Sequence, residues 1–173
     1  PDRLMKVILP FLVILILTSC WPTSVSFIDK GGMPEEWKTF SVINLNSDAA
    51  NAPLNYASVL SESLKDGVQT NTKLLLNPET GKGEIVIEGT IKSYTVIPVA
   101  VQEGDNASKN RLTISAQFTI EVSAPEEDQM NLTSTRFIDY DSNTDLASVE
   151  NQLLEEISRQ IVQDVINKLN SNW

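Results

Sequence analysis

The most regular pattern in the chain is an alternation of apolar and polar residues that ends at Val122. Its apolar members are Leu112, Ile114, Ala116, Phe118, Ile120 and Val122. Successive side chains of a strand point to opposite faces, so the pattern predicts a strand with one buried and one solvated face. Segment 84–101 alternates similarly, and the two predict an antiparallel hairpin. Pro98 indicates that the far end of the earlier strand is an edge or leaves the ladder.

Helical spacing occurs in two segments. Tyr56, Val59, Leu60, Leu64 and Val68 predict a one-sided helix of about four turns. A longer apolar stripe predicts a helix over 148–169, and its apolar residues at steps of four are Val149, Leu153, Ile157, Ile161, Val165 and Leu169.

Further strands are predicted at 37–45, 72–76 and 132–140, with an acidic loop at 125–131. The order of elements is therefore β, α, β, β, β, β, α. It predicts an α+β fold, a two-layer sandwich in which two helices pack on one face of a mostly antiparallel four- to five-stranded sheet.

The N-terminal region has the pattern of an export signal. An apolar run at 7–17 is too short to span a bilayer as a helix, but it has the length of a signal-peptide core. Leu17-Thr18-Ser19-Cys20 resembles a bacterial lipobox, in which the cysteine carries the lipid. We therefore expect a lipoprotein signal peptide at 1–19, a lipidated tether at 20–36 and a single domain at 37–173. The alternative is an incidental thiol near an ordinary cleavage site.

Trp21 follows Cys20, where many lipoproteins of the inner membrane have aspartate. By resemblance to that sorting rule, the sequence favours an outer-membrane protein that is held by its lipid and faces the periplasm. The covalent lipid on Cys20 is the only non-protein group that we expect, and no cofactor is implied.

The composition excludes most common types of active site. The chain has no histidine and one cysteine, so it lacks the parts for imidazole metal sites, Ser-His-Asp triads and intramolecular disulfides. Its formal net charge of −10 opposes attraction to a nucleic-acid backbone. We predict neither an enzyme nor a nucleic-acid binder.

Three cations are the candidate binding residues. Lys109 and Arg111 follow a polar loop, and Lys92 lies on the facing strand of the same hairpin. Such cations bind phosphates or carboxylates of an anionic glycolipid, and neighbouring hydroxyls add hydrogen bonds. The alternative is that they only keep a sheet rim in water.

Residues 139–150 resemble a calcium-binding loop, with acidic or amide side chains at four of its ligand positions. Thr144 stands where the sharp turn of such a loop needs glycine, and a predicted strand precedes it. The simpler interpretation is that these polar side chains turn the chain and cap the last helix. We therefore predict no metal site.

Several stretches resemble the LptE lipoproteins of lipopolysaccharide assembly, in the form found in Bacteroidetes-like bacteria. The resemblance covers the lipobox and nearly all of the remaining chain. Its most specific stretches are 60–66, 89–100, 110–114, 139–146 with 149–150, and 172–173. None of them is a catalytic motif. Val25-Ser26-Phe27 differs from the Tyr-Ser-Phe expected after the lipobox of this family.

The resemblance implies an outer-membrane lipoprotein that plugs and helps assemble an LptD-type β-barrel and binds lipopolysaccharide for insertion into the outer leaflet. On this interpretation we expect Lys92, Lys109 and Arg111 to contact the lipopolysaccharide and the solvated sheet face to lie against the barrel. The competing interpretation is a periplasmic lipoprotein that acts as a scaffold or lipid-binding module of another envelope complex.

Overall fold

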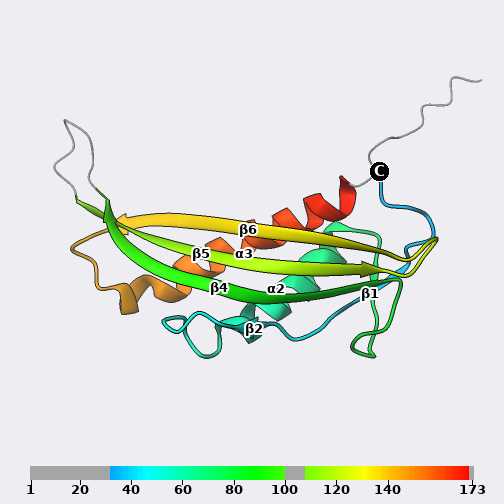
Figure 1. Ribbon diagram of the computed structural model, residues 1–173. Coiled ribbons are helices and arrows are strands. Elements are labelled where there is room, and N and C mark those ends of the chain that lie inside the picture. The colour runs from blue at the N-terminus through cyan, green and yellow to red at the C-terminus, as the bar shows by residue number, and fades with distance from the viewer. Residues whose placement is uncertain (1–31, 100–107, 172–173) are drawn as a thin grey trace, which may run out of the picture. The chain divides into compact units, whose positions relative to one another are not determined.

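The computed structural model describes residues 32–99 and 108–171. The predicted signal peptide, Cys20 and most of the tether lie outside these residues. Figure 1 shows the elements. In chain order they are β1 (Thr39–Val42), β2 (Asn46–Ser47), α2 (Tyr56–Asn71), β3 (Leu75–Leu76), β4 (Ile85–Val99), β5 (Lys109–Val122), β6 (Asp128–Asp141) and α3 (Leu146–Asn170).

The strands form one six-stranded sheet in the order β3-β1-β4-β5-β6, with β2 also paired to β4. The long strands β4, β5 and β6 pair antiparallel, whereas the β1–β3, β1–β4 and β2–β4 pairings are parallel. The α+β class is confirmed, with more strands than the four to five expected. The extra strand is β2, which lies just beyond the predicted segment 37–45, and within that segment only Thr39–Val42 forms a strand. The Leu45 amide donates to Ser61 Oγ at 2.9 Å, away from the ladder.

Two other predicted boundaries were wrong. β6 begins at Asp128, four residues before the predicted start, so the acidic loop is shorter than 125–131. β3 covers only the end of segment 72–76. Thr72 instead closes α2, since its hydroxyl donates to the Val68 carbonyl at 2.7 Å and accepts from the Leu74 amide at 3.1 Å.

Pro98 lies where the sequence predicted a sheet edge. It remains in register with Asn110 of β5. On its other side β4 pairs with β1 and β2 only as far as Ile91, within the described part of the chain. Proline has no amide hydrogen, and this unpaired margin is where its loss costs no ladder hydrogen bond.

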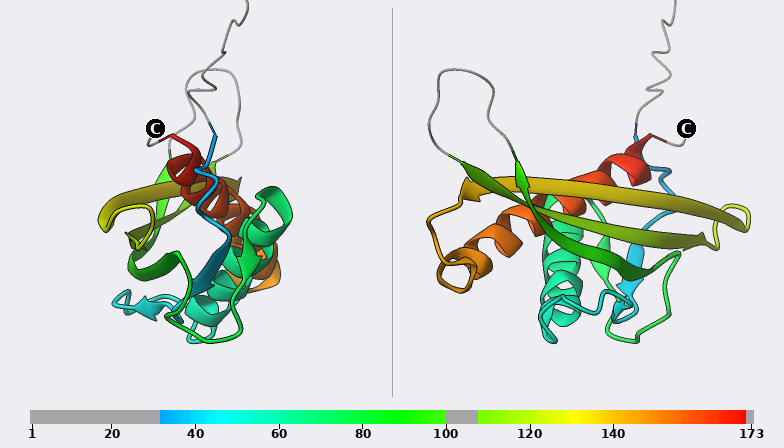
Figure 2. Two further views of the ribbon diagram at one scale, coloured as in Figure 1. Left: turned by 90° about the vertical axis from the view of Figure 1, so that its right-hand side faces the viewer. Right: turned by 60° about the vertical axis from the view of Figure 1, so that its left-hand side comes forward.

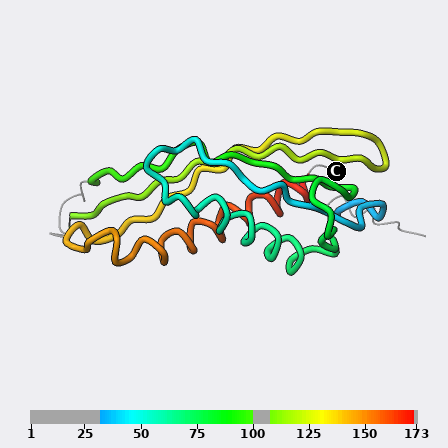
Figure 3. The backbone as a smooth tube through the Cα atoms, turned by 90° about the horizontal axis from the view of Figure 1, so that it is seen from below, coloured from blue at the N-terminus to red at the C-terminus, as the bar shows by residue number. Residues whose placement is uncertain are grey.

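Both helices pack on the same face of the sheet, as predicted (Figures 2 and 3). The six apolar residues of the β5 pattern are all buried against them. The helices contribute their predicted stripes, from Leu60 and Leu64 in α2 to Ile157 and Ile161 in α3, but the prediction was wrong for Val59, which is 44% exposed. Each buried leucine, isoleucine, valine or phenylalanine among them stabilises the fold by about 1.5–3 kcal/mol.

Polar contacts fix α3 to the sheet. The Tyr94 hydroxyl donates to Glu150 Oε1 at 2.5 Å, which ties β4 to the start of α3. Further along, Arg136 of β6 forms a two-point ion pair with Asp164, whose Oδ2 also accepts from the Ser134 hydroxyl at 2.5 Å. Burial opposes ionisation of Asp164, but these hydrogen bonds outweigh it and hold its pKa below the usual value.

Candidate functional site

The solvated face of β4, β5 and β6, here called the outer face, is opposite the helices (Figure 3). The register aligns its side chains in rows across the three strands. Hydroxyl and amide groups, with the single carboxylate of Glu88, fill the central rows, which are Glu88–Thr119–Asn131, Thr90–Gln117–Thr133 and Ser93–Ser115–Thr135. Thr135 Oγ1 donates to Ser115 Oγ at 3.0 Å. The face therefore offers many hydrogen-bonding groups and few charges at its centre.

One end of the outer face carries two of the predicted cations, Lys109 and Arg111. Arg111 donates from Nε and Nη2 to the two carboxylate oxygens of Asp139, at 2.6 and 2.8 Å. Its guanidinium carbon lies 3.9 Å from the centre of the Phe137 ring. The hydrogen bond from Arg111 lowers the pKa of Asp139, and the charge of Lys109 contributes to the same effect.

This arrangement leaves Arg111 able to bind an anion. A guanidinium has five N–H donors, and Asp139 engages it through two nitrogens. The donors on Nη1 are not used by Asp139. Because the carboxylate and the Phe137 ring hold the group in place, an incoming phosphate meets an oriented donor and loses little side-chain entropy.

Lys92 lies apart from the other two cations. Its Nζ is 2.6 Å from Asp48 Oδ2, beside the bulge between Ile91 and Ser93. Four residues of β5, roughly 13 Å at the ordinary strand rise, separate the rows of Ser93 and Arg111. Lys92 instead borders a small depression of about 220 Å³, lined also by Ile43, Asn44, Asn46, Glu88, Gly89, Thr90, Gln117 and Thr119. The structure thus groups Lys109 with Arg111 and leaves Lys92 by itself.

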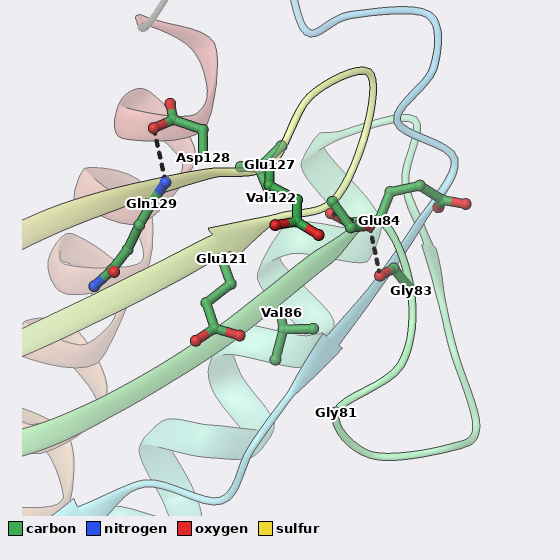
Figure 4. A pocket seen from close by; sticks show the side chains of 10 residues that line it. Gly81, Gly83, Glu84, Val86, Glu121, Val122, Glu127, Asp128 and Gln129 are labelled. Atoms are coloured by element: carbon green, nitrogen blue, oxygen red, sulfur yellow. Dashed lines mark hydrogen bonds between the residues drawn. The ribbon is translucent and has the colours of Figure 1, made fainter.

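The opposite end of the sheet is acidic. A depression of about 670 Å³ opens there, as Figure 4 shows. It is lined by Gly81, Gly83, Glu84, Val86, Glu121, Val122, Ser123, Glu127, Asp128 and Gln129. Hydrogen bonds from the hydroxyl and amide of Thr39, both 2.7 Å, lower the pKa of Glu84. Among the described residues, neither lysine nor arginine lines this depression, so these residues offer no cation to an anionic lipid.

The side chains of the calcium-like segment are used elsewhere. Asp139 pairs with Arg111, Glu150 accepts from Tyr94, and Asp141 Oδ1 accepts from the Asn143 amide at 2.8 Å. Within residues 32–99 and 108–171, no group of three or more acidic or cysteine side chains is placed to hold a metal ion. The segment serves as the turn between β6 and α3, but the predicted capping by its side chains was wrong, since Asp145 at the N-cap of α3 makes no side-chain hydrogen bond to the helix.

Sequence reasoning missed Phe137 and Asp139 as neighbours of Arg111. Their positions follow from the β5–β6 register, in which Thr113 faces Phe137 and Arg111 faces Asp139. The sequence shows the alternation in β5. The register between β5 and β6 depends on the turn at 123–127, which the sequence analysis placed at 125–131. A correctly placed turn would have revealed the pair.

A solved structure shares this fold. A minor lipoprotein from Acinetobacter baumannii is 16% identical, with 79% of this chain and 94% of that chain covered and a TM-score of 0.51. The rare lipoprotein B from Shewanella oneidensis is 17% identical over 78% and 95% of the two chains, with a TM-score of 0.40. A comparison with curated proteins gives no match.

The fold defines an α+β domain like that of the Acinetobacter baumannii protein. The chain belongs to the LptE family: the family profile, described as Lipopolysaccharide-assembly, matches residues 37–169. The family resemblance seen in the sequence is therefore confirmed. This is a non-catalytic family. In the described part of the chain, no helix is long and apolar enough to cross a membrane.

Proposed function

We propose that this protein is an outer-membrane lipoprotein, lipidated at Cys20, that plugs and helps assemble an LptD-type β-barrel and binds lipopolysaccharide for insertion into the outer leaflet. The observation that carries the proposal is the family match over residues 37–169, which spans β1 through α3. The protein acts by binding, without a reaction of its own. Its lipid holds the domain at the periplasmic side and in the barrel lumen.

The outer face supports this function physically. The interior of a large barrel is polar and wet, so a plug needs a surface that satisfies hydrogen bonds. The central rows of the outer face supply hydroxyl and amide groups at every second strand position, with little charge to desolvate. We propose that this part of the face lies against the barrel wall.

Lipopolysaccharide contact is proposed at Lys92, Lys109 and Arg111. The pair Lys109 and Arg111 is the principal contact, because both side chains lie at one end of the face and Arg111 keeps donors that Asp139 does not use. Lys92 is a secondary contact, since a phosphate there must compete with Asp48 at 2.6 Å.

Lipopolysaccharide binding by detergent-purified protein tests the residue assignment. Lys109→Glu and Arg111→Gln should each weaken binding at least about tenfold, because a charge-assisted hydrogen bond contributes about 1.5–3 kcal/mol. Reversal of all three cations should weaken it further. Lys82→Glu is the matched control, since it makes the same charge change in the exposed turn beside the acidic depression. Unchanged binding in the triple variant, with native circular dichroism, would remove the assignment.

Purification of a C-terminally tagged protein from solubilised outer membranes tests the partner. A stoichiometric large β-barrel that carries lipopolysaccharide is the expected result. Recovery of the protein alone, or with other envelope proteins, would favour a periplasmic scaffold instead. Replacement of Cys20 by alanine should release the protein from the membrane fraction if the cysteine carries the lipid.

A further inference from the structure

The outer margin of β6 is a long strand edge without a partner in the part of the chain that the structure describes. β6 is the last strand of the sheet, and it pairs with β5 through fourteen consecutive positions without a register shift. Exposed edges are usually protected by proline, by bulges or by inward-pointing charges. β6 has no proline and no bulge. Its one basic residue, Arg136, points inward but is neutralised by Asp164.

The ladder geometry identifies which backbone groups are available. The Ser142 amide donates to the Ser108 carbonyl at 3.1 Å, one step beyond the last β5–β6 pair. In an antiparallel ladder, hydrogen-bonded and non-hydrogen-bonded pairs alternate. Because Ser142 belongs to a hydrogen-bonded pair, the backbone amides and carbonyls of the even-numbered residues of β6 form the hydrogen bonds to β5. The amides and carbonyls of Thr133, Thr135 and Phe137 point to the free margin.

The side chains along this margin indicate which kind of ligand the edge would bind. Phe137 is 49% exposed, and Ile97, two strands away, is 52% exposed. Asp128 and Asp141 stand at the two ends of the strand. A second copy of the chain is a poor occupant, because paired β6 edges would bring their acids together with no free cation in either strand. An apolar residue with basic neighbours fits better.

We propose that the free edge of β6 is a docking site for an extended segment of a partner protein, which joins the sheet as a further strand. Its backbone pairs with Thr133, Thr135 and Phe137, an apolar side chain packs on Phe137, and basic side chains face Asp128 or Asp141. Edge addition of this kind draws affinity from main-chain hydrogen bonds and specificity from alternate side chains. It needs no lipopolysaccharide and so goes beyond the proposed function.

Site-specific photo-crosslinking in the native envelope tests the proposal. The crosslinker replaces Asn131, an exposed residue on the outer face of the edge strand, or Gln69 on α2 as the control position. The key variant is Thr135→Pro, which removes an outward amide and leaves the β5 ladder intact. Thr135→Ala is its matched control because it keeps the amide. Phe137→Ser is a second variant that leaves the backbone unchanged.

The barrel contact proposed above also predicts an adduct at position 131, so the diagnostic result is an adduct to an extended segment with basic residues whose yield depends on the outward amide of Thr135. Thr135→Pro should reduce its yield about two- to tenfold, since the one lost hydrogen bond contributes about 0.5–1.5 kcal/mol, while Thr135→Ala should not. Phe137→Ser should also reduce it. The proposal is overturned by no adduct at 131, by an adduct to a second copy, or by a yield that both Thr135→Pro and Phe137→Ser leave unchanged.

Discussion

The packing of the two helices can be tested at Gly67 of α2. A Cβ placed on Gly67 would lie 2.3 Å from Val162 Cγ1 of α3. Carbon atoms in contact are normally about 3.5–4.0 Å apart, so the two groups would be more than about 1 Å too close. Valine in a helix strongly prefers one χ1 rotamer, and its methyl group cannot turn away at low cost. Gly67 is thus required by the close approach of α2 and α3.

The magnitude follows from two opposing effects. Overpacking of this kind costs about 1–3 kcal/mol, whereas replacing glycine by alanine within a helix contributes about 1 kcal/mol. Gly67→Ala should therefore lower the free energy of unfolding by up to about 2 kcal/mol. Val162→Ala alone should cost about 1.6 kcal/mol, from two lost methyl groups at about 0.8 kcal/mol each.

The double variant is the decisive measurement. In Gly67→Ala with Val162→Ala the clash is absent, so the two changes should be less damaging together than their sum by about 1–3 kcal/mol. Urea unfolding of the full chain in detergent, followed by far-UV circular dichroism, measures this coupling. Thr70→Ala, at an exposed position of α2, is the control for helix propensity. A stabilised Gly67→Ala variant with no coupling to Val162 would refute the close approach.

Two further predictions concern the contacts that hold α3. Tyr94→Phe should lower the free energy of unfolding by about 1.5–3 kcal/mol, because it removes the hydrogen bond to Glu150; an unchanged urea midpoint would contradict this. The unfolding free energy should also fall as the pH drops below about 4. Asp164 has a lowered pKa in the fold, so its contribution is present above its unfolded pKa and is lost as the pH falls through its folded pKa. Asp164→Asn should weaken this fall of the unfolding free energy at acid pH, as measured by urea unfolding at several pH values. An unchanged pH dependence would contradict the role of the Arg136–Asp164 pair.

The sequence predicts correctly those elements whose periodic pattern extends over many residues. β5 has six alternating apolar positions, which leave one assignment of faces, and the helical stripes of α2 and α3 are equally clear. β2 and β3 have two residues each, too few to show a period. Their positions are set by tertiary contacts, such as the hydrogen bond from Leu45 to Ser61. The parallel pairing of β1 likewise has no local signal.

The candidate site was predicted in its residue types and only partly in its geometry. Lys109 and Arg111 share a strand face because they are two positions apart, which the alternation already shows. The Lys92–Asp48 pair joins residues 44 positions apart, and the Arg111–Asp139 pair joins residues 28 apart. Nothing in the local sequence links either pair. Only the strand register tells which carboxylate each cation meets.

The two proposed binding surfaces meet at Phe137, and this overlap makes them separable by experiment. The ring contacts the Arg111 guanidinium at the cationic end and belongs to the free edge of β6. Loss of the ring should therefore affect lipopolysaccharide binding and strand docking together. Lys109→Glu should weaken only the first, because its cation lies on β5, and Thr135→Pro only the second, because it alters a backbone amide. If each variant impaired both activities equally, one partner would be occupying the whole surface, and the separate assignments would have to be merged.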